Sequence, residues 1–64
     1  MTGEFRSYIA ANKAAAEKLA QQAAEEYELA ESRVARQWWV QQGLYWTQRV
    51  DYWARRQEEE DKYD

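Results

Sequence analysis

The sequence contains no cysteine, no histidine and no proline. Without cysteine the chain has no means of forming a disulfide, a thiolate zinc site, an iron–sulfur cluster or a cysteine nucleophile. Without histidine it lacks the usual general base, the usual zinc and haem ligand, and the side chain that changes charge near neutral pH. Without proline, no helix interior is forced to break.

Glycine and serine are also scarce. The two glycines, Gly3 and Gly43, lie far apart, so no glycine-rich loop can hold a phosphate. The two serines, Ser7 and Ser32, lie outside any nucleophile-elbow motif. We therefore expect no enzymatic activity, no metal centre, no cofactor and no small-molecule substrate.

Long apolar runs are missing as well. The longest stretch without a charge is the twelve residues from Gln37 to Gln48, whereas a membrane-spanning helix needs about 20 apolar residues. The first residues have neither the basic start nor the apolar centre of a signal peptide. We expect a chain that stays in the cytoplasm or inside a larger assembly.

Strong helix formers dominate the 64 residues, and they predict an all-α fold. Apolar residues recur at spacings of three and four along the first half, as on one face of a helix. Most members are alanine, which buries little area but allows close approach of a second helix. We predict a helix-packing seam made of Phe5, Ile9, Ala16, Leu19, Ala23, Tyr27, Ala30 and Val34.

Three aromatic pairs follow at intervals of seven residues: Trp38–Trp39, Tyr45–Trp46 and Tyr52–Trp53. Seven residues make two helical turns, so the pairs lie on one side of a helix. Arg49 and Arg56 are spaced to lie over neighbouring rings as cation–π contacts. We predict a protein interface made of Trp38, Trp39, Tyr45, Trp46, Arg49, Val50, Tyr52, Trp53 and Arg56.

Gly43 divides two possible chain paths. Inside a helix it costs only about 1 kcal/mol relative to alanine, whereas at a helix end it favours a turn. Because the aromatic pairs keep their phase across Gly43, we predict one long amphipathic helix, straight or kinked there, that packs with partner helices. The alternative is a two-helix hairpin that uses Gly43 as its hinge or turn.

Charge and composition divide the chain into segments. We expect a single helical module over residues 1–61, with an alanine-rich half at 4–35 and an aromatic, basic half at 36–56. Residues 57–64 form an expected acidic tail. The net charge is −3 over residues 1–32, +4 over 33–56 and −4 over 57–64. This order disfavours parallel pairing in register and favours antiparallel pairing or a hairpin.

The aromatic segment indicates an interaction protein, because tryptophan, tyrosine and arginine are enriched in the energetically dominant parts of interfaces. We expect a structural subunit that assembles with itself or with a larger protein complex. One alternative is an amphipathic helix lying at a membrane surface, but acidic segments flank it on both sides. A second alternative is a helix that binds nucleic acid, which the net charge of −3 disfavours.

Overall fold

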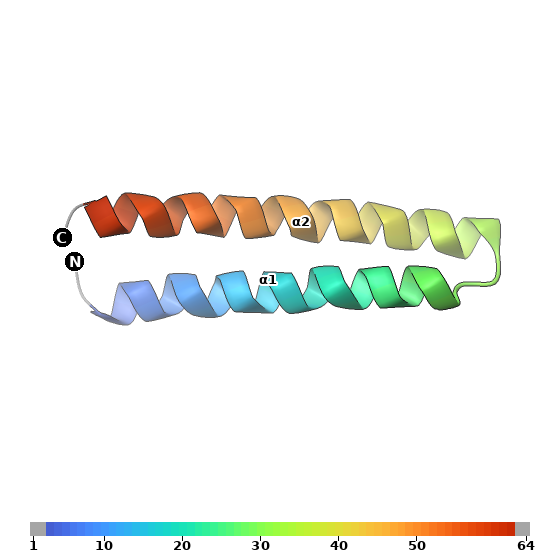
Figure 1. Ribbon diagram of the computed structural model, residues 1–64, viewed down its shortest axis with the longest axis horizontal. Helices are drawn as coiled ribbons and strands as arrows, with labels where there is room; N and C mark the ends of the chain where they lie inside the picture. The colour runs from blue at the N-terminus through green and yellow to red at the C-terminus, as the bar shows by residue number, and fades with distance from the viewer. Residues whose placement is uncertain (1–2, 63–64) are drawn as a thin grey trace.

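The computed structural model describes residues 3–62, which form two α-helices joined by a short turn. Helix α1 runs Gly3–Leu29 and helix α2 runs Arg33–Lys62. The helices lie side by side and antiparallel, with the turn at one end (Figure 1). Their Cα atoms extend over 48 × 14 × 11 Å. The predicted all-α class is confirmed, and the pair of packed helices fits the hairpin alternative.

The turn occupies residues 30–32, earlier than the expected position at Gly43. Ser32 caps α2, because its Oγ accepts a hydrogen bond from the backbone N–H of Ala35 at 3.0 Å. The Arg36 Nε donates to the Ala30 carbonyl oxygen at 3.1 Å, where the helical ladder of α1 has ended. These side-chain bonds replace backbone bonds lost at the turn, so the chain reverses without glycine or proline.

Two predictions of the chain path are therefore corrected. The helix is not continuous, because a hairpin covers the alanine seam with the aromatic half, whereas one long helix leaves both exposed to water. Gly43 is not a hinge or a turn, because it lies in the interior of α2 and its φ is not positive. The aromatic phase is unbroken across Gly43 because all three pairs belong to the same helix.

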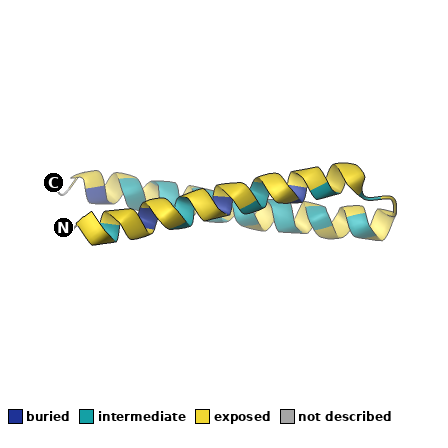
Figure 2. Cartoon of the chain, turned by 90° about the horizontal axis from the view of Figure 1, so that it is seen from below, coloured by how far each residue is buried: buried dark blue, intermediate teal, exposed yellow. Residues whose placement is uncertain are grey.

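A narrow strip between the helices forms the core. Ile9, Ala16 and Ala23 are buried, and Ile9 is only 1% exposed. They are seven residues apart, as expected for neighbouring turns of a helix that supercoils with another. Gly43 of α2 lies beside Ala23 of α1, since a Cβ at Gly43 would be 3.8 Å from the Cβ of Ala23. This neighbour relation gives the register of the two helices. Buried and intermediate residues follow the line of contact and exposed residues cover the rest (Figure 2).

The predicted seam follows this strip only in α1. Phe5 and Leu19 are half-buried beside the buried members, and Ala30 is half-buried in the turn. Tyr27 is exposed in the last turns of α1, and Val34 is exposed at the start of α2. Val34 leaves the seam because the turn resets the helical phase, so the continuous stripe expected for one helix does not exist.

The expected acidic tail is largely helical. Residues 57–62 continue α2, and Gln57 Oε1 accepts a hydrogen bond from Lys13 Nζ at 3.4 Å. Glu60 is only 9% exposed. Packing against α1 keeps this segment helical although its acids oppose the dipole at the helix end. The last two residues of the expected tail, 63 and 64, lie outside the described part of the chain.

Candidate interaction surface

The three aromatic pairs of α2 have one geometry. The ring centroids of Trp38 and Trp39 lie 4.6 Å apart at 87°. The centroids of Tyr45 and Trp46 are 4.9 Å apart at 82°, and those of Tyr52 and Trp53 are 5.0 Å apart at 83°. All three are edge-to-face contacts, which suit the ring quadrupoles. The sequence repeat is therefore also a structural repeat.

Each pair has one inner and one outer ring. The inner rings, Trp39, Trp46 and Trp53, are half-buried along the contact with α1. The outer rings point away from that contact: Trp38 is 53% exposed, Tyr45 52% and Tyr52 43%. The predicted interface residues thus divide between the packing of the hairpin and an open row on its surface.

Aromatic residues of α1 extend this row at the end opposite the turn. The ring centroid of Tyr8 lies 5.8 Å from that of Trp53, at 81°. Tyr8 also lies 6.4 Å from Phe5, and the Arg56 guanidinium carbon is 5.9 Å from the centre of the Phe5 ring. Tyr8 remains exposed although it touches two other rings. Both helices therefore contribute to one surface.

The two arginines predicted to lie over aromatic rings do so. Arg49 lies 4.8 Å from the centre of the Tyr52 ring and 5.6 Å from that of Trp53. Arg56 contacts a ring of α1 instead of one in its own helix. The Arg56 Nε is buried and makes no hydrogen bond, so this donor is unsatisfied inside the hairpin.

We call this surface the aromatic face. Residues seven apart share a side of a helix, so Leu19 and Glu26 lie on the same side of α1 as Phe5. The aromatic face consists of Phe5, Tyr8, Leu19 and Glu26 from α1, and of Trp38, Tyr45, Arg49, Tyr52 and Arg56 from α2. Val50, which was also predicted at the interface, is half-buried seven residues after Gly43, on the Ala23 side of α2.

A shallow apolar groove of about 320 Å³ occupies another part of the surface. Tyr27 and small residues of α1 line one wall, and Val40, Gly43 and Leu44 line the other. The absence of a side chain at Gly43 deepens the groove. Glu28 and Thr47 add polar side chains to this mostly apolar lining.

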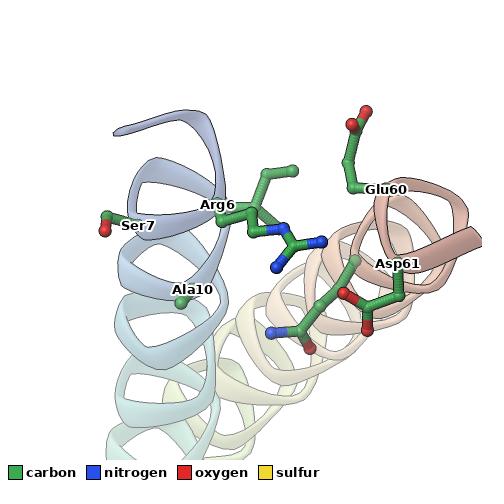
Figure 3. A pocket seen from close by; sticks show the side chains of 7 residues that line it. Arg6, Ser7, Ala10, Glu60 and Asp61 are labelled. Atoms are coloured by element: carbon green, nitrogen blue, oxygen red, sulfur yellow. The ribbon is translucent and has the colours of Figure 1, made fainter. Parts of the chain in front are cut away.

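A second opening, of about 290 Å³, lies at the end of the hairpin away from the turn. Arg6 extends from α1 towards α2, and Asp61 lies across the opening from it (Figure 3). The Glu60 carboxylate points away from the Arg6 guanidinium in the same view. Its Oε2 is buried without a hydrogen-bond partner, so Glu60 is a cost to stability in the hairpin.

Sequence reasoning missed Tyr8, Glu26 and Glu60. Tyr8 follows Phe5 at the helical spacing of three, and Glu60 follows Trp53 at the same interval of seven that relates the aromatic pairs. Both signals were present in the periodicity. Asn12, which interrupts the seam, donates to the Tyr8 carbonyl oxygen of its own helix at 2.8 Å, so its side-chain amide bonds within α1.

Neither described helix is long and apolar enough to cross a membrane. Across residues 3–62, no three acidic side chains gather in a way that could hold a metal ion. Comparisons with protein-family models, with curated proteins and with solved structures find no match to this chain.

Proposed function

We propose that this chain is a structural interaction module, which assembles with itself or with a larger protein complex through the aromatic face. The observation that carries this proposal is the open row of Trp38, Tyr45 and Tyr52, each about half exposed. Rings of this size are exposed to water here, and burial against a partner would supply favourable hydrophobic free energy. Their regular spacing along one helix suits a partner that is itself helical.

The small core supports the same proposal. Among residues 3–62, the buried hydrophobic residues are one isoleucine and two alanines. A chain of this length buries only about 60% of the surface that its unfolded form exposes. Small helical folds commonly gain the missing stability from association. A partner on the aromatic face would bury the outer rings and add a second layer to the hairpin.

The composition of the face matches that of protein interfaces. Tryptophan, tyrosine and arginine dominate binding energy where they are desolvated at the centre of a contact. Tyr45 is the middle member of the outer row, and Arg49 already lies over neighbouring rings. Its guanidinium is held in place before a partner arrives, which lowers the entropy lost on binding.

A photo-crosslinking experiment tests the proposal. A benzophenone-bearing amino acid replaces Tyr45 in cells that produce the chain, and the same amino acid replaces Thr47 as a matched control. Thr47 is exposed on the same helix, and it lines the groove away from the aromatic face. We expect light-dependent protein adducts from position 45 and none from position 47.

The mass of the adduct separates the two forms of assembly. An adduct of twice 7.7 kDa identifies a second copy, and any other mass identifies a different protein. If position 45 gives no adduct, or if position 47 gives the same adducts, the aromatic face has no specific protein partner and the proposal is wrong.

A further inference from the structure

We infer that the occupant of the aromatic face is a second copy of this chain, stacked face to face with the turns at opposite ends. The inference rests on the proposed function and specifies its partner. Two hairpins stacked in this way make a four-helix assembly related by a two-fold axis, the commonest symmetry of soluble oligomers. Two properties of the hairpin support it: the size of the face, and the spacing of two unpaired charges.

The size of the face suits a stable dimer. The hairpin is a single layer of two helices whose Cα atoms extend over 48 × 14 × 11 Å, and the aromatic face runs along its length. A broad side of the hairpin thus measures about 48 Å by 14 Å between Cα atoms. This is close to the roughly 800 Å² that each partner contributes to a standard interface. A second hairpin of the same length and width covers the whole row of outer rings.

Two side chains of opposite charge on this face, Glu26 and Arg56, form no ion pair within the described residues. The Arg56 guanidinium lies over the Phe5 ring, and its Nε is buried inside the hairpin, out of reach of a second molecule. Glu26 is half-buried on the same side of α1 as Phe5, over which Arg56 lies. Glu26 makes no hydrogen bond or ion pair within the described residues. Within one hairpin the two are at opposite ends and cannot meet.

The register of the helices places these two charges symmetrically. Because Gly43 lies beside Ala23, Glu26 is at the level of Val40 in α2. Gln48 is midway between Val40 and Arg56, and it is also close to the middle of Arg33–Lys62. A two-fold axis across the middle of the hairpin therefore brings Glu26 of each copy to the level of Arg56 of the other.

The same axis aligns the hairpins along their full length and brings Tyr45 to the level of Tyr52 of the second copy. The opposite stacking, with both turns at one end, places Arg56 at the level of Arg56 of the second copy. Like charges then meet at this level. Both arrangements bring Arg49 close to the level of Arg49 of the second copy, so the pairing of Glu26 with Arg56 is what favours the antiparallel arrangement.

A charge exchange tests the contact. Glu26→Arg and Arg56→Glu are prepared as separate variants of the full chain, and their association is measured by sedimentation equilibrium. Each variant alone brings like charges together at both contacts, so we expect its dimer to weaken by about tenfold or more. An equimolar mixture restores opposite charges at both contacts, and we expect association within about threefold of the original chain.

The recovery in the mixture separates a contact between copies from damage to the fold, because misfolded variants do not rescue each other. Glu17→Arg and Thr47→Glu serve as matched controls. Both positions are exposed and lie on the sides of α1 and α2 away from the aromatic face, and we expect each to leave association unchanged.

Spin labels at the turn test the orientation. The chain has no cysteine, so Glu31→Cys provides a single labelling site in the exposed turn. In the antiparallel dimer the two labels lie at opposite ends of an assembly about as long as the 48 Å hairpin. In the opposite stacking they lie side by side.

Three results would overturn the inference: a monomer at every concentration, labels close together, or no recovery in the mixture. If the chain is a monomer, the second-copy inference is wrong, but the proposed function still stands if crosslinking at position 45 gives an adduct with a different protein. If position 45 gives no adduct at all, both the proposed function and the second-copy inference are wrong.

Discussion

Gly43 has no steric reason to be glycine. It lies in the interior of α2, its φ is not positive, and a Cβ would meet only the Cβ of Ala23 at an ordinary van der Waals distance of 3.8 Å. Glycine in a helix interior also loses more backbone entropy on folding than alanine does. The position therefore reduces helix stability without giving the turn that its residue type suggests.

We predict that Gly43→Ala stabilises the hairpin by up to about 1 kcal/mol. The measurement is urea unfolding followed by circular dichroism at a fixed protein concentration, because association also contributes to apparent stability. Gly3→Ala is the control, since Gly3 is at the start of α1 with nothing near its missing Cβ. A loss of stability in Gly43→Ala would contradict the register of Gly43 and Ala23.

At the residue scale, periodicity predicted more than residue type did. The interval of seven placed Trp46 and Trp53 on one helix, and continuing it by one step reaches the buried Glu60. Gly43 was the misleading residue, since its freedom permits a turn but does not require one. Whether a glycine is used for a turn at all depends on packing elsewhere in the chain.

At the scale of elements, the turn of residues 30–32 is held by side chains. Ser32 Oγ accepts from the Ala35 N–H at the start of α2, and Arg36 Nε donates to the Ala30 carbonyl. The sequence gives only a weak signal here, because one serine among helix formers is compatible with a continuous helix. The turn forms because pairing the helices buries far more surface than a continuous helix does.

We predict that Ser32→Ala destabilises the hairpin by about 1 kcal/mol, since one N-cap bond is lost. Chemical unfolding measures the change. Ser7→Ala is the control, because Ser7 is exposed inside α1, and alanine is the better helix former there. Equal stability of Ser32→Ala and the original chain would show that the cap does not hold the turn.

At the scale of the whole molecule, the charge pattern disfavoured parallel pairing and was compatible with the hairpin, as it was with docking onto an acidic surface of another protein. The acidic residues 1–32 and the basic residues 33–56 belong mainly to different helices, and the hairpin sets them side by side. Sequence reasoning could not separate inner from outer rings, because both members of each pair lie on the same broad side of α2. That division needs the position of α1, which the sequence alone did not fix.

Because one ring of each pair is inner and the other outer, alanine substitutions at neighbouring residues should have different effects on stability and on association. Trp46 is half-buried between the helices, and Tyr45 is 52% exposed on the aromatic face. We predict that Trp46→Ala destabilises the hairpin itself by about 2 kcal/mol, because contacts with α1 are lost. Tyr45→Ala should leave the hairpin intact and weaken only the contact between copies.

Thermal unfolding over a hundredfold range of concentration separates the two effects. Because association stabilises the folded state by mass action, the melting temperature of the original chain should rise with concentration. Tyr45→Ala should flatten this rise while it preserves the melting temperature at low concentration. Trp46→Ala should lower the melting temperature at every concentration. If both variants change the curves in the same way, the inner and outer rings stabilise one common structure, and the hairpin has no folded state apart from its assembly.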